Sequence, residues 1–342
     1  MRRLGATAEA AQDATLAECS VLLSLPYRMR AAGLLHLLPP IKPALRRSMA
    51  ATREPGAAAI RLAVGQMTST GDTDANLAAC SRLASQAAAA GACMLSLPEC
   101  CTFLGDRDTD ALAIAERLPQ GGRVLAHLQG LARTHKLWLS LGGVPEASDV
   151  AGKRYNTHVV LDSNGVVRST YRKVHLFDLE LPGQGVALRE SNVTLPGTEA
   201  PPVVETPVGR CGLAVCYDLR FSGLFSGLVH RPDGGPGADV LLIPAAFTVP
   251  TGEAHWETLL RARAIENQCY VAAAAQGGQH STKRASYGHA MIVDPWGTVV
   301  ARVAEGPVAE GIAVADIDHD WLRVVRERMP LGQHRRPDVY SN

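Results

Sequence analysis

From Arg61 onward the chain alternates short apolar runs with amphipathic stretches, and this alternation restricts its fold more than any other feature. The predicted strands span 61–67, 93–97, 137–143, 155–161, 166–172, 203–206, 211–215, 240–243, 270–275, 289–293, 298–303 and 311–315. The predicted helices span 74–91, 124–135, about 217–230, 254–267 and 319–328. Strands that alternate with helices, interspersed with hairpins, are typical of a layered α/β domain with mixed sheets.

Two local signals refine this reading. The turn Asp162-Ser-Asn-Gly165 separates two strands with period-two patterning, which predicts a β-hairpin. Asp74 is a candidate N-cap for the helix that follows it. Hydrophobic residues make up 46% of the chain, and two sheets packed face to face, with helices outside, would bury most of them.

The length of 342 residues suits one large domain or two ordinary ones, and neither an internal linker nor a repeat interrupts the pattern. The net charge of +1 gives little support for nucleic-acid binding. No apolar stretch is long enough to suggest a membrane span. The eight cysteines contain no CxxC pair, so the sequence predicts neither a disulfide scaffold nor a zinc site.

Residues 1–56 have a different composition and form a predicted leader, with one domain at 57–342. Between Ser20 and Ser48 there is no acidic residue, and the segment carries five Lys and Arg residues, a pattern that fits a mitochondrial transit peptide. Three acidic residues upstream argue against this reading for the full-length start, and Met29 and Met49 are possible internal starts. We therefore expect mitochondrial and cytoplasmic forms that depend on the start site; a merely disordered leader is the alternative.

Cys216 stands where a predicted strand ends and a helical pattern begins. The start of a helix and nearby cations lower a thiol's pKa towards neutrality, so a cysteine in this place can act as a nucleophile. A small buried hydrophobic residue is the alternative role, and it is the common one for free cysteines.

Two other ionisable residues follow predicted strands. Glu99 ends the run Leu95-Ser-Leu-Pro-Glu99 with apolar residues behind it, which suits a general base. Lys173 follows the second strand of the predicted hairpin and could attract a developing oxyanion. Each alone reads more simply as a surface residue. Strand ends converge on one edge of a layered α/β fold, so the three together predict an active site.

These three motifs, in this order and approximate spacing, resemble the Glu–Lys–Cys triad of the nitrilase superfamily of carbon–nitrogen hydrolases. The resemblance covers roughly 61–340. Further segments are similar to its Nit branch, including Lys173-Val-His-Leu-Phe-Asp178, Arg284-Ala-Ser-Tyr-Gly-His289 and Asp294-Pro-Trp-Gly-Thr298. The fold implied is a four-layer α-β-β-α sandwich with two mixed sheets, usually paired as a dimer. The resemblance implies no metal and no organic cofactor.

The resemblance also implies roles for the site residues. Glu99 would be the base, Cys216 the nucleophile, and Lys173 with the main-chain N–H of Tyr217 the oxyanion donors. Glu190 best matches a second glutamate of the family, with Glu180 as the alternative. Arg220 is a candidate partner for a substrate carboxylate, although pairing with Asp218 or another scaffold carboxylate would explain it equally well.

The chemistry implied is hydrolysis of the amide of deaminated glutathione to 2-oxoglutarate and cysteinylglycine through a thioester on Cys216. An ω-amidase acting on 2-oxoglutaramate is the nearest alternative. A catalytically silent scaffold or signalling partner is an alternative of another class. Where the branch usually has Pro-Glu after Phe221, this chain has Ser222-Gly223, which leaves the start of the following helix uncertain.

Overall fold

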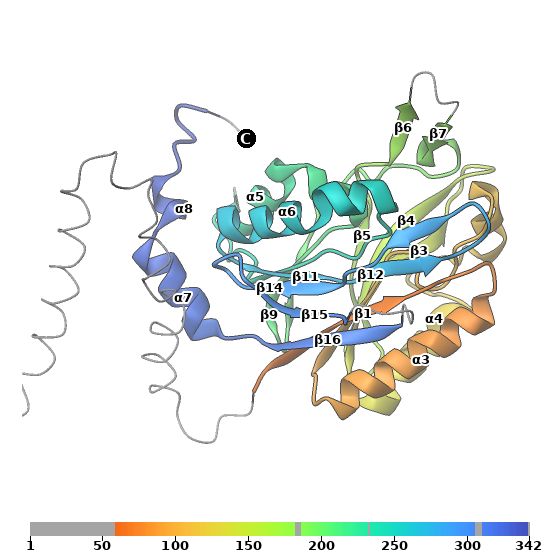
Figure 1. Ribbon diagram of the computed structural model, residues 1–342, viewed down its shortest axis with the longest axis horizontal. Coiled ribbons are helices and arrows are strands. Elements are labelled where there is room, and N and C mark those ends of the chain that lie inside the picture. The colour runs from red at the N-terminus through yellow and green to blue at the C-terminus, as the bar shows by residue number, and fades with distance from the viewer. Residues whose placement is uncertain (1–58, 182–185, 232, 305–309, 341–342) are drawn as a thin grey trace, which may run out of the picture. The chain divides into compact units, whose positions relative to one another are not determined.

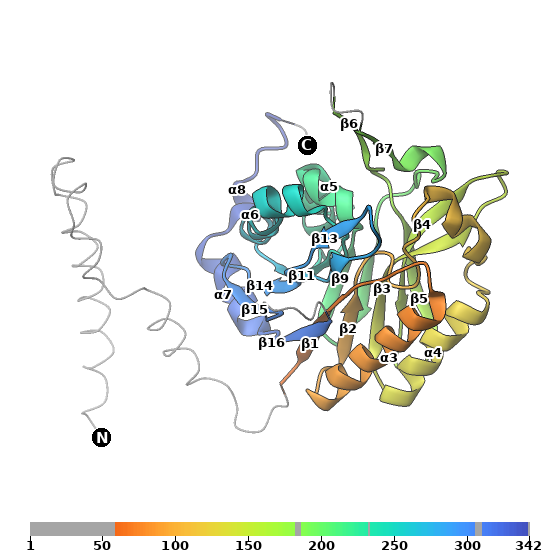
Figure 2. The ribbon, with the colours of Figure 1, turned by 45° about the vertical axis from the view of Figure 1, so that its right-hand side comes forward.

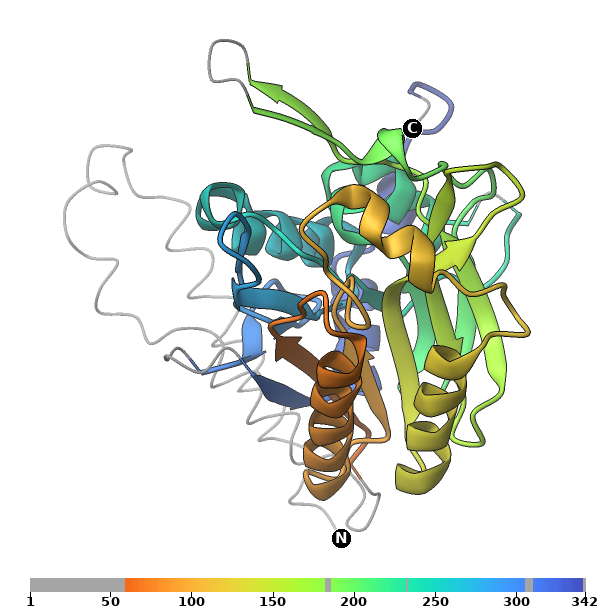
Figure 3. The same cartoon turned by 90° about the vertical axis from the view of Figure 1, so that its right-hand side faces the viewer.

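The computed structural model describes residues 59–181, 186–231, 233–304 and 310–340, so the predicted leader lies outside the described residues. Two mixed sheets make up the centre of the fold (Figure 1). A separate two-stranded hairpin of β6 (Asp178–Leu181) and β7 (Val186–Arg189) projects from the body beyond the end of β5 (Figures 1 and 3).

The eight-stranded sheet has the order β13-β12-β1-β2-β3-β4-β5, and β16 also pairs with β1. Its strands are β1 (Arg61–Met67), β2 (Met94–Leu97), β3 (Trp138–Ala147), β4 (Arg154–Leu161), β5 (Val167–Arg172), β12 (Ala275–Gln279), β13 (Ala285–Tyr287) and β16 (Gly311–Asp316). β1, β2 and β3 are parallel, whereas β4 and β5 form the hairpin that the turn at Asp162 predicts.

The six-stranded sheet has the order β15-β14-β11-β10-β9-β8. Its strands are β8 (Val203–Thr206), β9 (Gly209–Leu213), β10 (Val240–Leu242), β11 (Tyr270–Ala273), β14 (Met291–Val293) and β15 (Val299–Arg302). β9, β10 and β11 are parallel. All residues of β10 and β11 are apolar and buried, as expected for strands covered on both faces.

Helices cover the outer face of each sheet (Figures 2 and 3). α3 (Thr73–Ala89) and α4 (Arg123–His135) pack their apolar sides on the eight-stranded sheet. α5 (Ser222–Val229) and α6 (Val249–Asn267) contact the six-stranded sheet. The predicted four-layer α-β-β-α sandwich is confirmed, and one apolar cluster joins the facing sides of its two sheets.

Several predictions about elements hold and others are wrong. The final helix, α7 (His319–Arg328), has the predicted bounds. The N-cap of α3 is Asp72 and not Asp74, because the Asp72 carboxylate accepts hydrogen bonds from the N–H groups of Asp74 and Ala75. The predicted strand 270–275 is two strands, since the chain leaves the six-stranded sheet after Ala273 and enters the other at Ala275. The projecting hairpin was not predicted.

The helical segment after Cys216 is also divided. A 3-10 helix, η5 (Cys216–Arg220), comes first, and α5 starts at Ser222 after a break at Phe221. Phe221 has an extended backbone and caps α5 without a side-chain hydrogen bond. The Ser222-Gly223 pair therefore opens a short helix of its own, separate from the turn that holds Cys216.

Candidate active site

Glu99 lies just after the carboxyl end of β2, an inner strand of the eight-stranded sheet, and is 5% exposed. Its main-chain carbonyl accepts a 2.9 Å hydrogen bond from the side-chain amide of Gln276 on β12. The next residue, Cys100, has a φ of 59° and donates its N–H to Gly143 of β3. Hydrogen bonds with β12 and with β3 therefore fix the backbone that carries this carboxylate.

Lys173 follows β5 and is 2% exposed, which is rare for a lysine. Its N–H donates to the carbonyl of Asn156 on β4, and its own carbonyl accepts from Gly197. Both main-chain groups are thus held, which fixes the backbone that carries this side chain.

Cys216 is the first residue of η5, after β9 of the six-stranded sheet. Its N–H donates a 2.8 Å hydrogen bond to the carbonyl of Pro244, which follows β10. Its φ of 46° lies in the left-handed region, which is uncommon for any residue other than glycine. Such strain is found where a turn must present a side chain for function. The sharp turn lifts the thiol out of the line of the strand.

The structure brings Glu99, Lys173 and Glu190 together around one ammonium group. The Lys173 Nζ lies 3.0 Å from Glu99 Oε1 and 2.9 Å from Glu190 Oε2. The Cys216 thiol lies close enough to Glu99 and Lys173 for both charges to act on its pKa. Residues from the ends of strands in both sheets thus meet at one place, as the sequence predicts, although their chemical roles remain predictions.

Asn156 completes this cluster, and the sequence reasoning did not single it out. Its side-chain amide donates to Glu99 Oε1 at 2.9 Å and to Glu190 Oε1 at 3.2 Å. One amide group therefore spans both carboxylates. The sequence gives only a weak signal for Asn156. It is one polar residue in a strand of alternating polar and apolar residues, and nothing in that pattern shows which side chains it faces.

Glu190 is held more firmly than a loop carboxylate would be. Besides Lys173 and Asn156, the main-chain N–H of Phe177 donates to its Oε2 at 2.8 Å. Burial alone would raise the pKa of Glu190, but the Lys173 charge and these hydrogen bonds outweigh burial and lower it. The side chain of Glu180, the alternative second glutamate, lies outside the described residues.

The electrostatics of Lys173 follow the same balance. Burial by itself lowers the pKa of a lysine, yet the charges of Glu190 and Glu99 raise the pKa of Lys173 well above its usual value. The ammonium group is therefore charged at any physiological pH. It is a fixed positive charge and not a proton carrier.

For Cys216 the expected pKa shift is wrong. Burial and the charge of Glu99 raise the pKa of the thiol well above its usual value, and they outweigh Lys173 and a main-chain hydrogen bond from Ala246. The sequence reasoning counted the helix start and the cation but not the neighbouring carboxylate. The resting thiol is therefore protonated, and Glu99, whose charge adds to the effect of burial, is also the group placed to remove the proton.

An aromatic group adjoins the nucleophile. The Tyr217 ring packs edge-on against Phe177 and Phe221, with ring centroids 5.1 and 5.5 Å apart. The Arg220 guanidinium lies 5.3 Å from the Phe247 ring centroid. Arg220 makes no ion pair with a carboxylate of the described ranges, and its hydrogen-bond partner is His255 Nδ1 at 3.3 Å. Pairing with Asp218 is therefore not what the structure shows.

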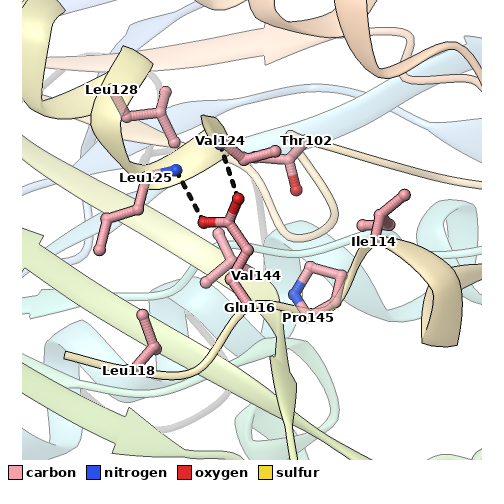
Figure 4. A pocket seen from close by; sticks show the side chains of 9 residues that line it. All are labelled: Thr102, Ile114, Glu116, Leu118, Val124, Leu125, Leu128, Val144 and Pro145. Carbon is pink, nitrogen blue, oxygen red and sulfur yellow. Dashed lines mark hydrogen bonds between the residues drawn. The ribbon is translucent and has the colours of Figure 1, made fainter. Parts of the chain in front are cut away.

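A pocket between α4 and β3 contains none of these residues (Figure 4). Its one carboxylate, Glu116, accepts hydrogen bonds from the N–H groups of Gly122, Val124 and Leu125 and so caps α4. The Glu116 carboxylate is used to cap the helix, so this pocket has a structural explanation.

In the part of the chain that the structure describes, no group of His, Cys, Asp and Glu could hold a metal ion. No described helix has the length and apolarity to cross a membrane.

Comparison with known proteins agrees with this geometry. The family model for carbon-nitrogen hydrolases matches residues 61–327. A human protein named deaminated glutathione amidase is 51% identical over 284 residues, which is 82% of this chain and 84% of that protein. The crystal structure of the Caenorhabditis elegans NitFhit protein matches with a TM-score of 0.76 and 46% identity, covering 82% of this chain and 66% of that one. Saccharomyces cerevisiae Nit3, described as a member of branch 10 of the nitrilase superfamily, matches with a TM-score of 0.70 and 29% identity, covering 81% and 96%.

Proposed function

This chain belongs to the carbon–nitrogen hydrolase family, and we propose that it hydrolyses deaminated glutathione to 2-oxoglutarate and cysteinylglycine. Its chemistry is hydrolysis of a carbon–nitrogen bond other than a peptide bond. The observation that carries the proposed mechanism is the buried Lys173 held between Glu99 and Glu190 beside the Cys216 thiol. The choice of substrate rests on the names of the relatives, such as the human protein above.

The first chemical step forms a thioester. Glu99 Oε1 already accepts from Lys173 and Asn156, so Oε2 is the oxygen available for a proton. Glu99 Oε2 takes the Cys216 proton while the sulfur attacks the amide carbonyl. The Lys173 ammonium and the N–H of Tyr217, at the start of η5, stabilise the oxyanion. When the intermediate collapses, Glu99 gives the proton to the leaving amine.

The second step releases the acid. Cysteinylglycine has left with the proton, and a 2-oxoglutaryl group remains on Cys216 as a thioester. Glu99 Oε2 takes a proton from water, whose oxygen attacks the thioester carbonyl at the same oxyanion position. Collapse expels the sulfur, which regains the proton from Glu99. Dividing the difficult amide cleavage into two easier displacements is the advantage of a covalent nucleophile.

Arg220 is the residue that we assign to the carboxylate of the 2-oxo acid. Its guanidinium has no carboxylate partner among the described residues, and it stands four residues from Cys216 beside the Tyr217 and Phe247 rings. A guanidinium presents paired N–H donors that match the two oxygens of a carboxylate. The Tyr217 ring would contact the substrate beside Arg220.

The test compares two substrates in one assay. Deaminated glutathione and 2-oxoglutaramate give the same 2-oxoglutaryl thioester and differ only in the leaving group. The ratio of their kcat/KM values therefore measures recognition of cysteinylglycine against ammonia. We expect deaminated glutathione to be preferred at least tenfold. Equal values, or a preference for 2-oxoglutaramate, would replace this proposal with the ω-amidase alternative.

A second measurement separates an enzyme from a silent scaffold. Rapid quenching during turnover, followed by intact-mass measurement, should show a 2-oxoglutaryl adduct on Cys216. Cys216→Ala should show neither the adduct nor turnover while it melts at a temperature within a few degrees of the wild type. Turnover by Cys216→Ala near the wild-type rate would contradict the thioester scheme.

Assembly and localisation are further proposals. We propose a homodimer or a higher homo-oligomer, on the family resemblance, and light scattering of the purified protein measures its mass in solution. We propose that the leader directs a mitochondrial form, with the cleaner transit peptide from a start at Met29, and that a start at Met49 gives a cytoplasmic form. Reporter fusions of 1–56 and 29–56 that both stay outside mitochondria would contradict this.

A further inference from the structure

The carboxylate of Asp218 lies between the two segments that carry Lys173 and Cys216. It belongs to η5, two residues after Cys216, and is completely buried. Its Oδ2 accepts from the N–H of Val215 at 2.9 Å and from the Tyr171 hydroxyl at 3.0 Å. Its Oδ1 accepts from the N–H of His175 at 3.2 Å and contacts His175 Nδ1 at 2.7 Å.

The partners of Asp218 are placed symmetrically about the lysine. Tyr171 precedes Lys173 by two residues in β5, and His175 follows it by two. The carboxylate thus holds the lysine segment on both sides and the turn of the nucleophile through Val215. The lysine segment extends from the eight-stranded sheet and η5 follows the six-stranded sheet, so this one side chain connects the two halves of the sandwich at the site.

A ring contact reinforces the connection. The His175 ring stacks on Phe221, with centroids 3.6 Å apart and an angle of 7° between the planes. Phe221 directly follows η5. The lysine segment is therefore attached to the start of η5 by Asp218 and to its end by this stack.

We propose that Asp218 is a positioning residue that sets the distance between Lys173 and Cys216 and thereby controls the rate of thioester formation. It touches neither substrate nor thiol in this scheme and acts through the two segments it connects. The proposal rests on the function proposed above for Lys173 and Cys216. Misplacement of reacting groups by about 1 Å can cost a hundredfold in rate, which makes such a connection important.

The pattern of donors explains why an aspartate is needed. Each carboxylate oxygen accepts from a main-chain N–H, Val215 for one and His175 for the other. An asparagine has one acceptor oxygen, so its NH2 group would face one of these N–H donors in either orientation. Asp218→Asn therefore keeps the size of the side chain and breaks one side of the connection.

The test compares Asp218→Asn with Asp162→Asn. Asp162 is also buried and also accepts main-chain N–H groups, those of Asn164 and Val166, but it lies in the hairpin turn at the other end of β5. Both of these N–H groups donate to the same oxygen, Oδ1, so the asparagine of Asp162→Asn can keep them while the charge is lost. We expect Asp218→Asn to lower kcat at least a hundredfold with KM within threefold of the wild type. Asp162→Asn should keep kcat within threefold, whatever its melting temperature.

Two milder variants guard against a failure to fold. Tyr171→Phe removes one hydrogen bond to Asp218, and His175→Phe removes another while a ring still stacks on Phe221. We expect each to lower kcat about tenfold with little change in KM. If Asp218→Asn does not fold, unchanged kcat in both of these variants overturns the proposal.

A readout without substrate separates this proposal from the proposed function. The rate at which iodoacetamide alkylates Cys216, followed by site-resolved mass spectrometry, depends on the placement of the thiol beside Glu99 and Lys173. At pH 7.5 we expect it to change at least tenfold in Asp218→Asn, because the thiol is displaced from both charges, and to stay within twofold in Asp162→Asn. Equal rates in the two variants, or a kcat loss that Asp162→Asn shares, would overturn the positioning role even if the substrate is another amide.

Discussion

At the scale of single residues, the site depends on which oxygen of Glu99 is free. Lys173 and Asn156 both donate to Oε1, so proton exchange with Cys216 is left to Oε2. Glu190, saturated by donors and with a lowered pKa, cannot substitute for it as a base. Glu99 and Glu190 both bind the Lys173 ammonium group, but they differ in their ability to accept a proton because their other hydrogen-bond partners differ.

The first prediction concerns Glu99→Gln. The charge of Glu99 raises the pKa of the Cys216 thiol, so its removal should lower that pKa while the base is lost. We expect amidase turnover to fall about a thousandfold, within the range for loss of a general base. The pH profile for alkylation of Cys216 by iodoacetamide should instead shift to lower pH than in the wild type. Glu205→Gln, at an exposed position on β8, is the control and should change neither property.

A second prediction concerns Arg220. Loss of a charged hydrogen bond to a substrate carboxylate costs about 1.5–3 kcal/mol, or roughly ten- to a hundredfold in affinity. We expect Arg220→Ala to raise KM by that factor for every 2-oxo acid amide tested, with a smaller effect for Arg220→Lys. Steady-state kinetics should show the KM difference shrinking for a simple amide that has no carboxylate. An equal effect on both kinds of amide would remove Arg220 from substrate recognition.

The residues of the site were only partly predictable. Glu99, Lys173 and Cys216 were found because each ionisable group follows an apolar strand, which is visible in sequence. Asn156 escaped because its partners come from two other segments, and only the folded chain brings them within 3.2 Å. The pKa of Cys216 was predicted in the wrong direction for the same reason, since the burial that raises it and the Glu99 charge, 117 positions away in sequence, both arise only in the folded chain.

At the scale of elements, β3 carries an irregularity next to the site. Its register with β4 shifts between Leu141 and Val144, and Gly143 within the shift has a φ of +72°. A Cβ at Gly143 would lie 2.4 Å from Asn156 Oδ1 and 3.1 Å from Glu99 Cγ. A glycine is therefore required at this position for two reasons. Its φ lies in the left-handed region, and a Cβ would collide with the side chains of Asn156 and Glu99.

The third prediction uses a matched pair of glycines. Gly152 has a φ of +71° but would place its Cβ in open space. Gly143→Ala and Gly152→Ala should thus share a conformational cost of about 1–3 kcal/mol in the free energy of unfolding. Only Gly143→Ala should also lower kcat, by tenfold or more, because it displaces Asn156 and Glu99. Equal activity in the two variants would mean that the cluster tolerates the shift.

Most elements could be predicted because their hydrophobic spacing is regular, and the failures lie where spacing carries no information. The run Tyr270-Val-Ala-Ala-Ala-Ala275 is apolar throughout, so nothing in it marks the residue at which the chain changes sheets. The α3 cap was assigned to Asp74 although Asp72 and Asp74 both stand at the helix start. Choosing between them requires the backbone dihedral angles.

At the scale of the whole molecule, a polar chain crosses the space between the sheets. Ser96 on β2 contacts Ser140 on β3 at 3.2 Å, and Ser140 contacts His158 Nε2 on β4 at 2.7 Å. His158 Nδ1 lies 2.9 Å from the carbonyl of Ala214, after β9 of the other sheet. Burial lowers the pKa of His158 to about 4, so its ring is neutral at physiological pH.

The fourth prediction follows from this histidine. An unfolded histidine binds a proton below about pH 6.5, whereas the folded one does so only near pH 4. The unfolded state therefore binds more protons between these values, and stability falls as the pH falls through that window, by about 3 kcal/mol in total. Urea unfolding at pH 5 and pH 7.5 should show a smaller pH dependence for His158→Gln than for the wild type. An identical dependence would mean that other groups cause the acid sensitivity.

The position of β1 in the eight-stranded sheet has a consequence for how the protein is made. β1 pairs with β2 on one side and with β12 and β16 on the other, so partners from the last third of the chain complete an element near its beginning. During translation, β1 leaves the ribosome long before these partners exist. One edge of β1 therefore stays without its hydrogen-bonding strands until synthesis is nearly finished. An unpaired apolar strand is prone to aggregation, which favours capture by a chaperone. A premature stop before β16 would leave residues 61–66 of β1 without their antiparallel partner.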